Sequence, residues 1–279
     1  MLRDVLDLLR CPHCGAALAS AGGAVACKEG HSFDVARQGY VSLLTGDTQL
    51  GSADTASMVA AREAFLAAGH LDPLAEALGG EAERALAGPG CVIDLGAGTG
   101  WYLAHVLDRL PGRRGLALDL SKHALRRAAR AHPRIGAVAC DAWCRLPVRD
   151  GVAALVLSVF APRDGAEITR VLRPGGALLV VTPTGAHMEQ LVSALRLLSV
   201  DARKQERLDA KLGPHLELER GAGLEWPLEL GPADVAHAVA MGPSARHVEQ
   251  GELDVLVAAL PQPVEVTASV RIAVYRTCA

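Results

Sequence analysis

Aromatic side chains make up only 3% of the 279 residues, although half of the chain is apolar. No run of 18 apolar residues occurs, which argues against a membrane-spanning helix. The net charge of −3 argues against indiscriminate binding to polyanions, so any nucleic-acid surface must be a local patch. Residues 1–7 lack the apolar stretch and the cleavage site of a signal peptide. We therefore expect a cytoplasmic protein with no membrane partner.

The seven cysteines are an odd number in a chain without an export signal, which disfavours a disulfide framework. Cys11 and Cys14 form a C-x2-C turn that ends in glycine, and Cys27 and His31 follow after a spacer of twelve residues. The pattern C-x2-C-x12-C-x3-H supplies four ligands for tetrahedral zinc. Because four strong ligands leave no open position, the predicted zinc is structural. The alternatives are free thiols or a degenerate site, and His13 is a competing ligand within the first turn.

A glycine turn follows a short predicted strand at residues 91–95, which are apolar apart from Asp94. Glycines occupy positions 96, 98 and 100, and a helix is predicted to begin near Tyr102. Such a turn lets the backbone approach a nucleotide closely. The spacing acid-x-G-x-G-x-G differs from the G-x-G-x-x-G of nicotinamide-binding domains and is typical of S-adenosylmethionine (SAM) methyltransferases. Asp94 would then serve the cationic amino group of SAM.

Two further acids follow predicted strands. Asp119 ends a strand that begins at Gly115, at a place where an acid holds ribose hydroxyls. Asp141 follows the third strand and could accept the adenine amino group, with the Ala142 amide opposite the ring. Because ligands sit at the carboxyl ends of strands in open α/β sheets, the three acids predict one SAM site. The predicted SAM-binding residues are Asp94, Gly96, Ala97, Gly98, Gly100, Trp101, Tyr102, Asp119, Leu120, Asp141 and Ala142.

The pattern of elements predicts an α/β fold, a Rossmann-like sheet of the class I SAM methyltransferase type, with a small N-terminal zinc-binding module. Asp54 or Thr55 can cap a helix that extends to Gly69, and Gly88-Pro89-Gly90 marks the edge of the main domain. The predicted divisions are residues 1–36, the zinc-binding module; residues 37–88, a linker with helices; and residues 89–279, the methyltransferase domain.

The second half of the chain is less regular. The segment from Asp201 to Glu225 is polar and predicts a mobile insertion, and two short strands, Val264–Thr267 and Val270–Tyr275, are predicted to close the sheet. Charge is also uneven, since residues 113–149 contain nine Lys or Arg and only two acids. This excess is either a solvated helix face or a track for phosphate groups.

Several segments together resemble one known family. They are the N-terminal C-x2-C-x12-C-x3-H pattern, Gly39-Tyr40-Val41, the helix from Asp54-Thr55 to Gly69-His70, Asp94-Leu95-Gly96-Ala97-Gly98, Phe160-Ala161-Pro162, Arg173-Pro174-Gly175-Gly176 and Met241-Gly242-Pro243. They look like the RlmA group of 23S ribosomal RNA guanine-N1 methyltransferases, which includes a macrolide-resistance branch. The resemblance extends over nearly the whole chain. The resemblance implies a guanine in the loop of hairpin 35 of 23S rRNA as the substrate, 1-methylguanine as the product, and a homodimer.

The acceptor atom sets the chemistry that such a site must perform. Guanine N1 carries a proton and no free lone pair, so a base must remove the proton or the site must stabilise the O6 anion. Phe160 is the candidate stacking wall for the guanine, and Arg62 is a further candidate substrate contact. Arg246 or His247 is a candidate contact to O6 or to a phosphate. Asp164 and His247 are the candidate proton acceptors.

Two other classes of function remain open at this point. A SAM-dependent methyltransferase of a small metabolite would not need the zinc module, and its activity should survive deletion of residues 1–36. A noncatalytic RNA-binding protein that retains the SAM pocket would bind hairpin RNA but transfer no methyl group.

Overall fold

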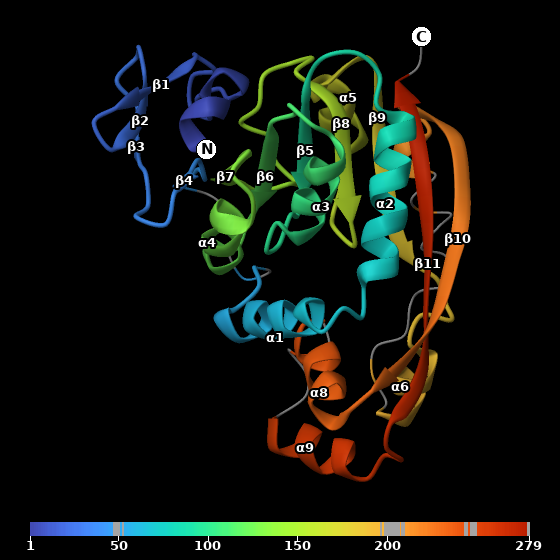
Figure 1. The fold of residues 1–279 in the computed structure, drawn as a ribbon. Helices are drawn as coiled ribbons and strands as arrows, with labels where there is room; N and C mark the ends of the chain where they lie inside the picture. Colours follow the sequence, from blue (N-terminus) through green and yellow to red (C-terminus); the bar gives the residue numbers. More distant parts are fainter. Residues whose placement is uncertain are drawn as a thin grey trace.

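The computed structural model describes residues 1–46, 51, 53–195, 197, 207, 210–242, 245 and 250–277. Figure 1 shows a small N-terminal sheet beside a large twisted sheet that carries helices. The elements in chain order are η1 (Leu2–Leu8), β1 (Leu18–Ala21), β2 (Ala24–Cys27), β3 (Ser32–Asp34), β4 (Tyr40–Ser42), α1 (Ala56–Ala67), α2 (Asp72–Ala85), β5 (Cys91–Leu95), α3 (Trp101–Arg109), β6 (Gly115–Asp119), α4 (Lys122–Ala131), β7 (Ile135–Ala139), β8 (Ala153–Val159), α5 (Gly165–Val171), β9 (Leu172–Pro183), α6 (Glu189–Ala194), β10 (Leu216–Leu230), α8 (Pro232–Ala240), α9 (Gln250–Ala258) and β11 (Val264–Thr277).

The large sheet has the strand order β10-β11-β9-β8-β5-β6-β7-β4. The strands from β4 to β9 in this order pair in parallel, and β11 and β10 add an antiparallel edge. β5 lies between β6 and β8, so the chain order of the strands reverses on the two sides of β5. A reversal of this kind is where open α/β sheets bind their ligands. The acid-glycine turn therefore lies at the position that this topology reserves for a ligand.

Apolar side chains cover both faces of the large sheet. Within β5, Val92 belongs to a core shared with helices α2, α3 and α4, and the adjacent Ile93 belongs to a second core shared with η1 and α5. Alternate side chains of a strand point to opposite faces, so a strand with apolar residues throughout fits a sheet that is covered on both sides. Helices α1, α8 and α9 form a separate group below the sheet in Figure 1.

Side-chain hydrogen bonds cap the first turns of α1 and α4. The Thr55 hydroxyl accepts a hydrogen bond from the Met58 amide at 3.3 Å, so Thr55 rather than Asp54 caps α1. The Ser121 hydroxyl accepts from the Ala124 amide at the start of α4. Such caps satisfy amide groups that have no partner within the helix, which is worth about 1 kcal/mol.

The N-terminal module is joined to the body by packing as well as by the chain. Val5 of η1 is fully buried against Gly136 of β7. A Cβ atom placed on Gly136 would lie 2.2 Å from the Cγ2 atom of Val5. Residues 40–42, which fall in the predicted linker, form β4 and pair with β7 at the edge of the large sheet. The chain between the zinc-binding residues and the methyltransferase sheet therefore contributes a strand to that sheet.

Two expectations about the C-terminal part are wrong. Residues 216–225 belong to the long strand β10 and not to a mobile insertion, while most of residues 201–209 lie outside the described residues. The two closing strands are one continuous strand, β11, because β10 pairs with it along its whole length. In the part of the chain that the structure describes, no helix has the length and apolar character needed to cross a membrane.

Candidate active site and zinc site

A cavity of about 970 Å³ lies at the carboxyl ends of the parallel strands. Its walls come from the ends of β5, β6, β7, β8 and β9 and from helices α1 and α8. Ten of the eleven predicted SAM-binding residues line it: Asp94, Gly96, Ala97, Gly98, Trp101, Tyr102, Asp119, Leu120, Asp141 and Ala142. Its size matches that of pockets that bury drug-sized ligands.

The glycines of the turn serve different purposes. Gly96 has φ +67°, and a Cβ atom there would lie 2.6 Å from the Ala161 Cβ atom, so the loop after β8 can approach only a glycine. The Gly98 amide donates to the Asp119 carboxylate at 2.8 Å. Gly100 does not line the cavity; a Cβ atom there would lie 2.9 Å from the Ala128 Cα atom, so this glycine lets α3 pack against α4.

Two carboxylates lie at the floor of the cavity. Asp94 is only 2% exposed, and burial raises its pKa well above the ordinary value, with a further contribution from the negative charge of Asp119. Burial also raises the pKa of Asp119, although the Ser121 and Gly98 amides donate hydrogen bonds that oppose the shift. A buried carboxylate without a cation is costly, so this pair of acids favours a ligand that brings positive charge or hydrogen-bond donors.

A tyrosine and an arginine face these acids. The Tyr102 hydroxyl is buried and has no hydrogen-bond partner in the described structure, and burial raises its pKa. Arg62 of α1 donates to the Asp54 carboxylate and, at 2.9 Å, to the Met241 carbonyl oxygen at the end of α8. Arg62 thus joins two helices at the wall of the cavity. The orphaned Tyr102 hydroxyl indicates that a polar group belongs beside it, since buried polar atoms are normally paired.

The loop after β7 carries the third acid and an exposed aromatic side chain. Asp141 accepts a hydrogen bond from the Trp143 amide at 2.9 Å, which fixes the turn. Trp143 is 59% exposed and lines the cavity, and the Lys211 ammonium lies 5.2 Å from the centre of its ring. Trp143 was not among the residues predicted from the sequence.

Phe160 stands on the opposite loop, after β8. Its backbone has φ +54°, which is rare for a residue other than glycine, and its side chain is 42% exposed at the cavity. Residues held in strained conformations cluster at functional sites. The His187 ring, which also lines the cavity, has its centroid 6.0 Å from that of Phe160. His187 gives no signal in the sequence, because an isolated histidine after a strand matches no motif.

The remaining predicted residues are not gathered in this way. Asp164 does not line the cavity; its carboxylate accepts from the Glu167 amide at 3.0 Å and caps α5. Arg246 and His247 lie outside the described residues.

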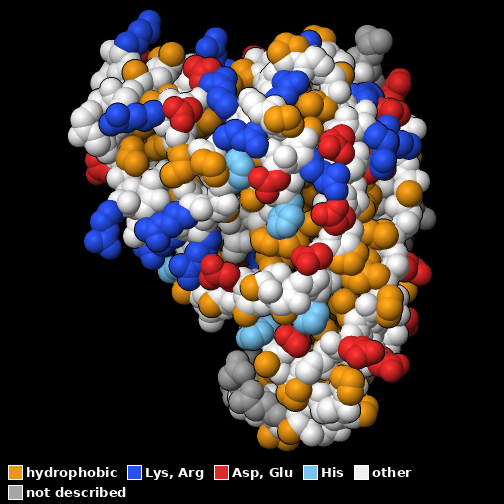
Figure 2. Space-filling view, in the orientation of Figure 1, with side chains coloured by type: hydrophobic (Ala, Val, Ile, Leu, Met, Phe, Trp, Pro, Cys, Tyr) orange, Lys and Arg blue, Asp and Glu red, His pale blue; other side chains and the backbone are white. Residues whose placement is uncertain are grey.

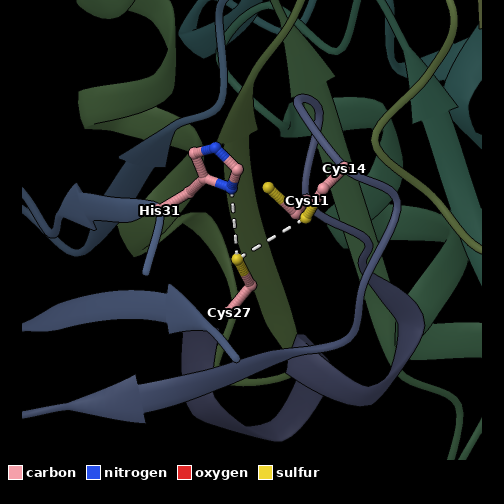
Figure 3. A group of neighbouring side chains, drawn as sticks. All are labelled: Cys11, Cys14, Cys27 and His31. Carbon is pink, nitrogen blue, oxygen red and sulfur yellow. Dashed lines mark hydrogen bonds between the residues drawn. The ribbon is translucent and has the colours of Figure 1, made fainter. Parts of the chain in front are cut away.

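The four predicted zinc ligands come together in the N-terminal module (Figure 3). Their ligand atoms all lie within 4.8 Å of one another. The Cys27 sulfur is 3.6 Å from the Cys14 sulfur and 3.4 Å from Nδ1 of His31. Desolvation raises the pKa of the Cys27 thiol, but hydrogen bonds involving His31 and the nearby backbone lower it more, to about 6.

This donor set fits a structural metal. Three thiols and one imidazole are a usual set for tetrahedral zinc, and a lowered thiol pKa favours the thiolate that binds metal. His13 is not one of the four clustered residues. Its ring lies beside the cluster, with its centroid 5.0 Å from that of His31 and stacked on Phe33 at 5.8 Å.

Comparisons with known proteins agree with both sites. The model of the N-terminal zinc ribbon of RlmA matches residues 9–47, and a methyltransferase-domain model matches residues 92–176. The 23S rRNA (guanine(748)-N(1))-methyltransferase of Streptomyces fradiae is 51% identical over 99% of this chain and 99% of its own. The chain belongs to the family of 23S rRNA (guanine-N1)-methyltransferases. A Micromonospora griseorubida protein to which 23S rRNA (guanine-N1) methylation is assigned is 52% identical over 98% of both chains.

Membership of this family makes the chain a SAM-dependent methyltransferase with a zinc ribbon, as the sequence predicted. Among solved structures, the [4+2]-cyclase SpnF has a TM-score of 0.49 at 19% identity, covering 74% of this chain and 81% of its own. The YcgJ protein of Bacillus subtilis also has a TM-score of 0.49, at 15% identity, covering 73% and 99%.

Proposed function

We propose that this chain methylates N1 of a guanine in a hairpin loop of 23S rRNA. The observation that carries the proposal is similarity along the full length to an enzyme named for guanine 748 of 23S rRNA, combined with a cavity that suits SAM. The hairpin is the predicted RNA partner. The target within it is inferred from the relative's name and from the resemblance described above.

The residues at the floor of the cavity are assigned to SAM. Bound SAM supplies an electrophilic methyl group on a sulfonium sulfur. Asp94 would serve its amino group, Asp119 its ribose hydroxyls and Asp141 its adenine. The burial of Asp94 and the orphaned hydroxyl of Tyr102 support this assignment, because a cationic, hydrogen-bonding ligand would lower the cost of burying the acid and give the hydroxyl a partner.

The guanine is assigned to the wall formed by Phe160. A target base has to leave its stack to reach a recessed methyl donor, and aromatic side chains replace part of the lost stacking. Phe160 is both exposed and at the cavity, which supports its role. Arg62 also lines the cavity, where it can contact the RNA or hold the end of α8 in place through its bond to Met241.

A basic surface supports the RNA partner. Figure 2 shows Lys and Arg side chains gathered over the N-terminal module and α4. On α4, Lys122, Arg127 and Arg130 are exposed, and Arg37 and Lys28 are exposed in and near the zinc ribbon. These cations form a local patch on a chain with a net charge of −3. Such a patch binds phosphates in a salt-dependent manner.

Primer extension tests the proposal. A 23S rRNA fragment with the hairpin is incubated with the protein and SAM, and reverse transcription is then run through the loop. N1 methylation blocks Watson–Crick pairing, so we expect a stop at one guanine, absent without SAM and with Asp119→Ala. Full extension through the hairpin, with methyl groups incorporated elsewhere in the RNA, contradicts the assignment.

Three further statements are part of the proposal. We expect a homodimer, which light scattering coupled to gel filtration tests. We expect the cytoplasm as the location, since that is where bacterial rRNA is, and cell fractionation tests it.

The resemblance to the macrolide-resistance branch supports macrolide resistance, measured as the inhibitory drug concentration in a susceptible host with and without the gene. The division at residues 36 and 88 stays a prediction that limited proteolysis can test.

A further inference from the structure

The turn that follows β9 brings a histidine into the cavity. Residues 184–188 connect β9 to α6, and His187 in this turn lines the cavity next to Phe160, with the two ring centroids 6.0 Å apart. If Phe160 is the wall against which guanine stacks, His187 lies where it can reach the edge of the same base. A histidine in this place can act on the acceptor.

The hydrogen bonds of His187 determine its tautomer. The Ser269 backbone amide donates to Nδ1 of His187 at 3.1 Å. An atom that accepts an N–H bond carries no proton, so the neutral ring has its proton on Nε2. In this form His187 is a hydrogen-bond donor through Nε2–H and is not a base at that atom. The arrangement therefore suits stabilisation of negative charge and does not suit proton removal.

A polar network on β10 and β11 fixes this turn. Ser269 is fully buried, and its hydroxyl donates to the Glu225 carboxylate at 2.7 Å. The Thr184 hydroxyl lies 2.5 Å from the Ser269 hydroxyl. The Thr184 amide donates to the Ser269 carbonyl oxygen at 3.1 Å, and the His187 amide donates to the Thr184 carbonyl oxygen at 3.2 Å. After the histidine, the Met188 amide donates to the Thr267 carbonyl oxygen at 2.7 Å, so the turn is attached to β11 on both sides of His187, which limits the orientations open to the imidazole ring.

We propose that His187 is a catalytic residue that donates the Nε2–H hydrogen bond to O6 of the target guanine, an inference that rests on the proposed function. When N1 loses its proton to solvent water, the electron pair of the N1–H bond is shared between N1 and O6. Negative charge grows on O6, and the Nε2–H group stabilises it. The N1 pair then forms the new N–CH3 bond, and the pair of the broken C–S bond stays on sulfur.

Donors aimed at developing negative charge have large effects on rate. Removing one such donor lowers kcat by about 100- to 1,000-fold in well-studied enzymes. His187→Asn is the informative variant, because its amide oxygen can still accept from the Ser269 amide while the donor at the Nε2 position is lost. We expect kcat to fall by about 100-fold or more, with unchanged affinity for SAM and for the hairpin. His187→Gln, whose longer side chain places an amide N–H farther out, should recover part of the loss.

Gln190 provides a matched control. Its side-chain oxygen accepts from the Thr267 amide of β11 at 3.2 Å, so it makes the same kind of bond to the same strand, but it does not line the cavity. Gln190→Ala should keep the wild-type kcat. A loss in Gln190→Ala equal to that in His187→Asn would mean that attachment of this segment to β11 matters and the donor does not, which overturns the proposal.

The deciding experiment combines the variant with a substituted acceptor. Single-turnover rates are measured for wild type and His187→Asn on hairpins with guanine or 6-thioguanine at the target, whose sulfur is a weak hydrogen-bond acceptor. If Nε2–H contacts O6, the variant loses about 100-fold on guanine and much less on 6-thioguanine, because the contact is already weakened. Equal losses on both RNAs overturn the role of His187. A wild-type protein that methylates neither RNA overturns the proposed function itself, so the two failures are distinguishable.

Discussion

Replacing Gly96 by alanine tests how closely the two loops at the cavity floor must approach. Gly96 has φ +67°, a conformation that alanine adopts only with strain, and the new methyl group would lie 2.6 Å from the Ala161 Cβ atom. Ala161 follows Phe160 directly, so a shift of this loop moves the wall assigned to the guanine. One added methyl group should therefore affect both stability and ligand binding.

The expected magnitude has two parts. The left-handed backbone costs about 1–2 kcal/mol for a residue with a Cβ atom. Forcing a methyl group into a packed contact costs about 1–3 kcal/mol more. The sum, about 2–5 kcal/mol, is a large fraction of a typical free energy of unfolding of about 5–15 kcal/mol. We also expect affinity for SAM to fall by about tenfold or more, since about 1.4 kcal/mol of lost contact has that effect.

Gly112→Ala is the matched control, because Gly112 has φ +76° and nothing within 4 Å of an added Cβ atom. It should lose only the backbone part, about 1–2 kcal/mol. Urea denaturation gives the free energy of unfolding of each variant, and calorimetry gives the affinity for SAM. The double variant Gly96→Ala with Ala161→Gly should recover about 1–3 kcal/mol relative to the sum of the single changes. Equal destabilisation in Gly96→Ala and Gly112→Ala, with no coupling to Ala161, would refute the close approach.

Three other changes have outcomes set by the structure. Cys27→Ser should remove the one zinc per chain, measured by elemental analysis, and unfold the ribbon; a fully folded wild-type protein free of zinc would contradict the metal assignment. Asp94→Asn should raise the Tm of the SAM-free protein at neutral pH, because the folded pKa of Asp94 lies above the unfolded value. The gain in Tm should shrink as the pH falls through the folded pKa of Asp94 and vanish below its unfolded pKa of 3.8. A gain in Tm that does not depend on pH would contradict the burial argument. Arg62→Ala should lower the free energy of unfolding by about 1 kcal/mol, since its partners are partly exposed, whereas Arg130→Ala on the solvent side of α4 should have no measurable effect in the same urea titration.

Local signals were sufficient to predict which residues of the acid-glycine region line the cavity and which four side chains cluster in the N-terminal module. The acid-glycine turn, the acids after two further strands and the Cys3His spacing each depend on a few residues that are adjacent in sequence. Phe160 and Arg62, which belong to recognisable segments, also line the cavity, and their contact with the substrate stays a prediction. His187 was missed, since no motif surrounds it and the pairing of β9 with β8 and β11 brings it to the cavity. Trp143 was missed although it directly follows Asp141 and Ala142, which the sequence had placed at the site.

The strand errors have a different cause. In β10, Leu224, Trp226, Leu228 and Leu230 alternate with polar residues or Pro227, which is the pattern of a half-buried edge strand. The signal was present, but the polar residues before it suggested a loop. β4 has only three residues, each paired with a residue of β7 that lies 97 positions later in the chain, so no local pattern predicts it.

The short strand β4 has a consequence for any attempt to trim the protein. It covers the outer edge of β7, and η1 fills the space above Gly136 with Val5. Removal of the first 42 residues would leave unpaired backbone groups and exposed apolar surface on the methyltransferase body. Exposed strand edges of this kind promote self-association. The loss of activity in such a truncated protein would then reflect aggregation and would not test RNA recognition. Substitutions at individual surface residues are therefore the better way to test whether the ribbon binds RNA.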